Sequence, residues 1–120
     1  MKNLKYDYDF ENDSLFLYWG DGDYDISEFF DSSIAVDFNK DKAPIGIEIF
    51  KASLKFHTKK TNLQNITNGF VKISIGEKEI KFSINLSIEL HSKLMPIKPI
   101  NIIKCNDLNI PNTETSLAIA

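Results

Sequence analysis

The stretch Ile34-Ala-Val-Asp-Phe-Asn39, followed after Lys-Asp-Lys-Ala by Pro44-Ile-Gly-Ile-Glu-Ile49, decides the fold of this chain. Both runs alternate apolar with other residues, which is the pattern of a strand with one buried face. With residues 40–43 as the loop, an antiparallel hairpin brings all the apolar side chains to one face. The expected pairs on that face are Phe38 with Ile45, Val36 with Ile47 and Ile34 with Ile49. A slip of one residue would expose the whole set, so the register is well specified.

Two further stretches show the same pattern around polar turns at residues 11–14 and 76–79. The pairs expected on the buried face of the first hairpin are Phe10 with Leu15, Tyr8 with Leu17 and Tyr6 with Trp19. Those expected in the second are Ile75 with Ile80, Ile73 with Phe82 and Val71 with Ile84. Alternation continues to Leu90, which predicts one long strand over residues 80–90.

Several blocks of these hairpins carry a family resemblance. They are Tyr8-Asp9 before an acidic turn, Leu15-Phe-Leu17, Ile34-Ala-Val-Asp37, Ile45-Gly-Ile-Glu-Ile49 and Ala52-Ser53. With these blocks, residues 6–54 resemble a widespread family of small prokaryotic domains of unknown function. The chain departs from that pattern at Lys42-Ala43, where the family has a glycine-containing turn, and in residues 55–120, which extend beyond the usual short domain. The resemblance implies a β fold and transfers no catalytic residue.

Length and composition indicate a single, mainly β domain. The 120 residues, 42% hydrophobic, can bury one core, and 17 isoleucines favour strands. We expect antiparallel hairpins in a meander that closes as a sandwich or half-barrel, with at most a helical turn near residue 52. The expected segments are family-like hairpins over residues 6–54, a loop over 57–69, a further hairpin and strand over 70–105, and a tail over 109–120. That tail is expected either to be disordered or to pair with a sheet edge.

Nothing in the sequence predicts a membrane span or a secretory leader, because no apolar run reaches 18 residues. A cytoplasmic protein is therefore expected. The single Cys105 cannot form an intrachain disulfide, and its apolar neighbours predict a small buried side chain.

Charge is divided unevenly along the chain. Residues 1–50 hold 12 acids and four lysines, whereas residues 51–120 hold ten lysines and five acids. The two parts are expected either to lie side by side and partly neutralise each other, or to present a dipolar surface to a partner. All 14 basic residues are lysine. Direct nucleic-acid binding is not expected, because bidentate contacts to bases and phosphates favour arginine.

Two groups of acids are candidates for metal chemistry. The run Gly20-Asp-Gly-Asp-Tyr-Asp25 gathers oxygen ligands of the kind Ca²⁺ prefers, but it lacks the spacing of a helix-loop-helix calcium loop. Asp37 and Glu48 share the outward face of the central hairpin near Lys51, so a metal-dependent hydrolase stays an alternative. A solvated turn and ordinary strand polarity explain the same residues. No spacing marks a catalytic, cofactor or metal site strongly, and we assign none.

The strongest functional signal is a set of aromatic side chains among acids. If Leu15 and Leu17 face the core, Phe16 and Tyr18 face outward, together with the pair Phe29-Phe30. Their cover is expected to be either residues 70–105 or a second protein. We expect a non-enzymatic module that binds a protein partner or itself. An acidic mimic that inhibits a basic nucleic-acid-binding protein is the alternative. The expected interface residues are Phe16, Tyr18, Phe29 and Phe30, and the expected acidic partner surface is Asp7, Asp9, Asp21, Asp23 and Asp25.

Overall fold

The computed structural model describes residues 2–20 and 24–119 and contains ten strands with two single-turn helices. The strands are β1 (Lys2–Asp9), β2 (Ser14–Tyr18), β3 (Ile26–Asp31), β4 (Ile34–Phe38), β5 (Pro44–Ile49), β6 (Ile66–Ile75), β7 (Glu79–Leu90), β8 (Lys93–Pro96), β9 (Ile100–Cys105) and β10 (Thr113–Ile119). The helices are α1 (Ala52–Lys55) and α2 (Lys60–Leu63). Neither helix in the described ranges is long and apolar enough to cross a membrane.

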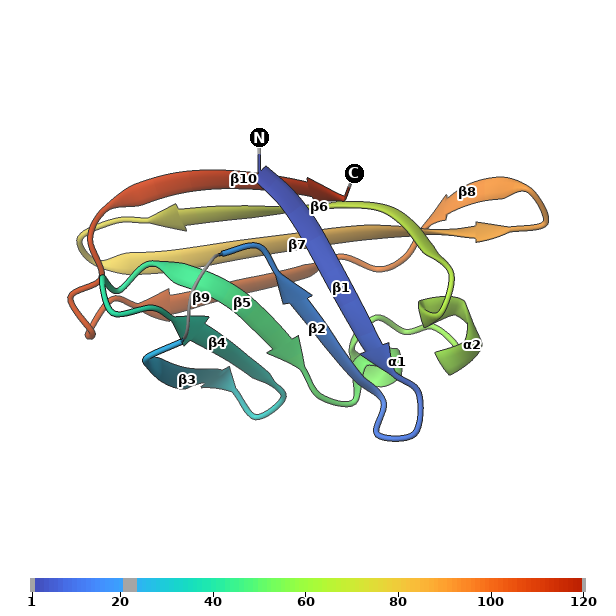
Figure 1. Cartoon of the computed structure of the whole chain (residues 1–120), viewed down its shortest axis with the longest axis horizontal. Coiled ribbons are helices and arrows are strands. Elements are labelled where there is room, and N and C mark those ends of the chain that lie inside the picture. The colour runs from blue at the N-terminus through green and yellow to red at the C-terminus, as the bar shows by residue number, and fades with distance from the viewer. Residues whose placement is uncertain (1, 21–23, 120) are drawn as a thin grey trace.

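The strands form one sheet that folds over on itself. Its order is β3-β4-β5-β2-β1-β10-β6-β7-β8, and β9 pairs with β7 as well. Every pairing is antiparallel except that of β1 with β10, which joins the two halves. In Figure 1, strands β1 to β5 run obliquely in front of β6, β7, β9 and β10. The expected mainly β fold of antiparallel hairpins is confirmed, and the sheet is not closed into a barrel.

The hydrophobic core lies between the two halves of the sheet. Strands β1 to β5 contribute fully buried side chains such as Leu17 and Ile47, and β6 and β7 contribute Val71 and Ile84. No polar or charged residue of the described ranges is buried in it. Each fully buried aliphatic side chain contributes about 1.5–3 kcal/mol relative to exposure, so this interior supplies the main stabilising term.

The register of the first hairpin differs from the prediction by two residues. Tyr8 pairs with Leu15, not Leu17, and Asp9 pairs with Ser14. The reason is the turn, where the Asp9 carboxylate accepts a hydrogen bond from the Asn12 backbone N–H at 3.2 Å and another from the Asn12 side-chain amide at 2.7 Å. Phe10 is drawn into this turn and is 40% exposed. Side chains alternate between the two faces of a strand, so a shift of two residues leaves the remaining side chains of β1 and β2 on their predicted faces.

The central hairpin has the predicted register except at its loop. Val36 pairs with Ile47 and Ile34 with Ile49, which confirms those two pairs. Phe38 pairs with Pro44 instead of Ile45, because the register shifts at a bulge. The Ile45 carbonyl at this bulge accepts a hydrogen bond from the backbone N–H of Trp19, the residue after β2, at 3.0 Å.

The later part of the chain follows the prediction closely. The pairs Ile75–Ile80, Ile73–Phe82 and Val71–Ile84 are confirmed, and β7 is the long strand expected. The segment expected as a loop over residues 57–69 contains α2 and the start of β6. Cys105 is exposed, not buried, because it lies at the end of the edge strand β9. The tail was expected either to be disordered or to pair with a sheet edge. In the structure its strand β10 pairs with both β1 and β6.

Candidate functional site

The outer face of the β1–β5 layer carries acids and aromatic rings in rows across the strands. Cross-strand pairing places five residues in one row, namely Asp7, Phe16, Glu48, Ala35 and Phe29. The next row contains Lys5, Tyr18, Gly46, Asp37 and Ser27. The term acidic-aromatic face is used below for Asp7, Asp9, Phe16, Tyr18, Phe29, Asp37, Glu48 and Phe50.

Carboxylates surround the Phe16 ring on this face. A hollow of about 350 Å³ is lined by Asp7, Asp9, Ser14, Phe16, Asp37 and Glu48, so four acids and no lysine of the described residues line it. Ser14 Oγ donates to Glu48 Oε2 at 3.4 Å, and Ser27 Oγ donates to Asp37 Oδ1. Each of these carboxylates keeps acceptor positions open to solvent, and the hollow therefore presents concentrated negative potential.

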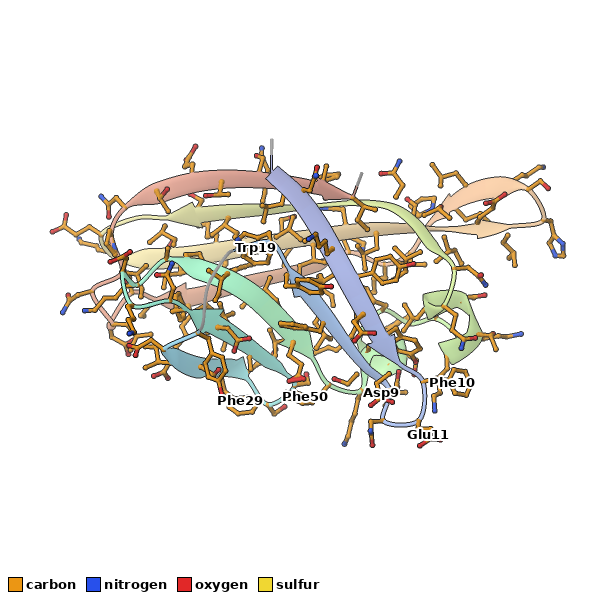
Figure 2. All side chains as sticks on the ribbon, in the orientation of Figure 1. Asp9, Phe10, Glu11, Trp19, Phe29 and Phe50 are labelled. Carbon is orange, nitrogen blue, oxygen red and sulfur yellow. The ribbon has the colours of Figure 1, made fainter. Side chains whose placement is uncertain are left out.

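Two stacked aromatic pairs lie on the same face. The Phe16 and Tyr18 rings have centroids 5.0 Å apart, and those of Phe29 and Phe50 are 5.9 Å apart. Figure 2 labels Phe29 and Phe50 side by side on the front layer. Gly46 allows the first pair to lie against the sheet, since a Cβ at this position would be 2.9 Å from Phe16 Cε1. The glycine of the central hairpin thus makes room for an aromatic ring on β2.

The predicted interface residues divide between two environments. Phe16 and Tyr18 face outward as expected and are half-buried, while Phe29 is 58% exposed. Phe30 turns inward at a bulge in β3, and its ring centroid lies 5.5 Å from that of Phe82. Phe30 therefore packs against the core. Residues 70–105 cover the inner side of the layer, so the expectation that they cover Phe16 and Tyr18 is wrong.

The predicted acidic residues are also separated by the fold. Asp7 and Asp9 lie on the acidic-aromatic face. Asp25 lies just before β3, where its backbone N–H donates to the Phe38 carbonyl at 2.7 Å. Asp21 and Asp23 lie outside the described residues.

Asp37 and Glu48 line the hollow together, as their places on the central hairpin predict. Lys51, the third residue of the hydrolase hypothesis, lines a different pocket. Within residues 2–20 and 24–119, no group of three or more His, Cys, Asp or Glu side chains has the arrangement of a metal site.

A partly buried polar cluster was missed by the sequence analysis. Asp13 Oδ1 accepts the Tyr8 hydroxyl at 2.6 Å, and its Oδ2 accepts the Ser53 hydroxyl at 2.6 Å. Burial raises the pKa of the Asp13 carboxyl, but the hydrogen bonds from Ser53 and Tyr8 outweigh burial and leave the pKa below its ordinary value. Burial and the bond to Asp13 hold the pKa of Tyr8 well above its ordinary value. Two of the blocks that carry the family resemblance, Tyr8-Asp9 and Ala52-Ser53, meet at this cluster with the acidic turn.

Comparison with known proteins relates the chain to a family of unknown function and to a curated relative. A family model described as "Protein of unknown function (DUF2283)" matches residues 5–53. A protein of Methanosarcina mazei named "Putative hypoxanthine phosphoribosyltransferase" is 36% identical over 107 residues, which cover 89% of this chain and 85% of that protein. The chain belongs to the same family as this Methanosarcina mazei protein, and residues 5–53 form a DUF2283 domain. The DUF2283 match includes every residue of the acidic-aromatic face and the Asp13 cluster. No solved structure has significant similarity to the chain.

Proposed function

We propose that this chain is a binding module that holds a basic segment of a protein partner on the acidic-aromatic face. The observation that carries the proposal is the hollow around Phe16, in which Asp7, Asp9, Asp37 and Glu48 gather without a lysine among the described lining residues. Carboxylates of like sign side by side repel one another. A cationic partner removes that repulsion, and this gives the hollow its preference for positive charge.

The aromatic rings support the same preference. The face of a phenyl or phenol ring attracts an ammonium or guanidinium group, which contributes about 0.5–1 kcal/mol at an exposed site. An exposed ion pair contributes about 0.2–1 kcal/mol. No single contact of this size gives a stable complex, so the affinity has to come from several lysines or arginines that bind together. Such binding weakens as salt screens the charges.

The spacing of the rings suggests the length of the bound segment. Phe16 lies on β2 and Phe29 on β3, which are three strand positions apart in the sheet. Neighbouring strands are separated by about 4.8 Å, so the two rings lie roughly 14 Å apart. An extended segment rises about 3.3 Å per residue, and roughly five residues therefore span the face. The proposed ligand is a short extended segment with two or more basic side chains.

A partner that itself binds nucleic acid fits this chemistry. Surfaces that bind phosphate backbones are rich in lysine and arginine, and the row of Asp7 and Glu48 presents the sign of charge that such surfaces attract. In this narrower proposal the chain acts as an acidic mimic. Competition between the chain and a DNA duplex for the same basic protein tests it, and simultaneous binding of both would contradict it.

The name of the Methanosarcina mazei protein suggests a different function, the transfer of a phosphoribosyl group. Such a reaction needs a site that holds phosphate. The carboxylates around Phe16 repel phosphate, so the acidic-aromatic face is not suited to that substrate. If the chain carried out such a reaction, its phosphate site would have to lie elsewhere in the molecule.

The proposal is tested by the fluorescence anisotropy of a labelled oligolysine peptide, titrated with the chain at about 0.05 M and about 0.3 M salt. We expect saturable binding that the higher salt weakens. The double variant Asp7→Asn with Glu48→Gln is expected to bind more weakly and with less salt dependence. The matched control is Glu77→Gln in the β6–β7 turn with Glu79→Gln at the first residue of β7, two exposed acids whose replacement removes the same charge. Equal weakening by both double variants would contradict a specific face.

A further inference from the structure

A cationic pocket lies where the β3–β4 turn, α1 and the segment before β9 meet. Its volume is about 550 Å³, and the residues that matter to the argument are Lys51, Lys55, His57, Lys98, Ser33 and Asn101. None of them belongs to the acidic-aromatic face. Ligand pockets for small molecules have volumes of about 300–1,000 Å³, so this pocket is large enough for a nucleotide-sized ligand.

The positive charge in this pocket is only partly balanced. Lys55 forms an ion pair with Asp31 at 3.1 Å, and the same carboxylate accepts the Ser33 backbone N–H at 2.7 Å. Lys98 Nζ lies 3.5 Å from His57 Nε2, at hydrogen-bonding distance, so two basic side chains line this part of the pocket together. Within the described ranges, neither Lys51 nor Lys98 forms a salt bridge, and no carboxylate lines the pocket.

The basic side chains are carried by a fixed piece of backbone. Lys51 and His57 lie directly before and shortly after α1, and both have the left-handed backbone conformation, with φ of 52° and 53°. The Ala52 backbone N–H donates to the Asp13 carbonyl at 2.9 Å, and the Ser53 backbone N–H donates to Asp13 Oδ1 at 3.0 Å. These bonds attach α1 to the turn of the first hairpin. The backbone on both sides of α1 is therefore fixed before any ligand binds, which lowers the entropy cost of binding.

We propose that the cationic pocket binds a small ligand that carries two linked phosphate groups. Lysine ammonium groups bind phosphate as compact charges, and the hydroxyl and amide groups of Ser33 and Asn101 are suited to hydrogen-bond its oxygens. One phosphate would accept hydrogen bonds from Lys98 and His57, which line the same part of the pocket. The second phosphate would then be within the part of the pocket lined by Lys51 and Lys55. A ligand with a single negative charge leaves one of these two positions unneutralised.

The test is a titration of the full chain with inorganic diphosphate, followed by calorimetry and by amide chemical shifts. We expect saturable binding with shifts at Ser33, His57 and Asn101. Lys51→Gln and Lys98→Gln are each expected to weaken binding about tenfold, the effect of losing one charge-assisted hydrogen bond. The control Lys78→Gln, at the exposed β6–β7 turn, should leave the affinity unchanged.

Three results would overturn this inference. The first is the absence of saturable binding, and the second is equal weakening by Lys78→Gln. The third is tighter binding of a single-stranded oligonucleotide through the same lysines, which would indicate a macromolecular ligand instead. The oligolysine experiment tests other residues. A failure of the diphosphate titration therefore leaves the proposal for the acidic-aromatic face intact, and a failure of the oligolysine experiment leaves the proposal for the cationic pocket intact.

Discussion

The Ser53 hydroxyl donates a hydrogen bond of 2.6 Å to Asp13 Oδ2, a residue 40 positions earlier in the chain. Asp13 has φ of 51° in the turn of the β1–β2 hairpin, and its carbonyl also accepts the Ala52 backbone N–H. This contact attaches α1 to the first hairpin. It therefore positions the chain that leaves the β1–β5 layer and enters the second half of the sheet.

Substitution of Asp13 should destabilise the fold. Asp13→Asn retains a residue type that tolerates positive φ but removes the charge that accepts the bonds from Ser53 and Tyr8. Hydrogen bonds to charged groups contribute about 1.5–3 kcal/mol, so we expect a loss of about 2 kcal/mol in the free energy of unfolding. Urea denaturation measures it. Asp107→Asn, an exposed acid, is the control, and an equal effect of the two substitutions would contradict the role of Asp13.

The same carboxylate should make stability depend on pH. The folded pKa of Asp13 is lowered from its ordinary value of 3.8, so the unfolded chain binds the proton more readily. The contribution of Asp13 is therefore present above that ordinary value and is lost as the pH falls through the folded pKa. Unfolding free energies measured between neutral pH and the acid limit of folding should fall less steeply in Asp13→Asn than in the wild type. Parallel curves would count against a lowered pKa.

Gly46 and Phe16 should show energetic coupling. Because a Cβ at Gly46 would be 2.9 Å from Phe16 Cε1, Gly46→Ala is expected to displace the ring and to lower the free energy of unfolding by about 1 kcal/mol. In a Phe16→Ser background the ring is gone, and the same substitution should be neutral or stabilising, since glycine is unfavourable in a strand. A double-mutant cycle measures the difference. Additive effects of the two substitutions would show that the ring does not depend on Gly46.

The outer aromatics should be dispensable for folding. Phe16→Ser with Tyr18→Ser removes half-buried rings from the outer face, so the variant is expected to stay folded. Leu17→Ala, at a fully buried position on the same strand, is expected to cost about 2–5 kcal/mol. Circular dichroism and light scattering after size-exclusion chromatography check both variants. If the double variant is unfolded, the rings belong to a core. If the wild type is a dimer and the double variant is a monomer, the rings contact a second copy of the chain.

The faces of the strands could be predicted from the sequence better than their register. Alternation assigned Asp7, Phe16 and Glu48 to the outer face, and this held even where the first hairpin is shifted by two residues, because a shift of two preserves the face. The register itself depends on turn contacts such as that between Asp9 and Asn12, and several turns fit the same polar residues. The Ile45 carbonyl at the bulge accepts a bond from Trp19, the residue that follows β2.

Contacts between distant segments could not be predicted in the same way. The sequence of β10 is polar from Thr113 to Ser116, and its place in the sheet depends on pairing with β1 and β6, which are distant in the chain. The Asp13–Ser53 contact and the cationic pocket likewise join segments far apart in the chain. Local periodicity carries no information about such pairs. The prediction that Phe30 faces outward failed for a simpler reason, because consecutive residues of a strand point to opposite faces and Phe29 takes the outer one.

The most direct test of the central claim is to map the oligolysine peptide onto the chain by amide chemical shifts. If the acidic-aromatic face binds basic segments, the shifts should be confined to β1–β5, with the largest at Asp7, Phe16 and Glu48, and should disappear in Asp7→Asn with Glu48→Gln. Shifts that spread equally to the acids at Glu77 and Glu79, or that persist in the double variant, would contradict the claim.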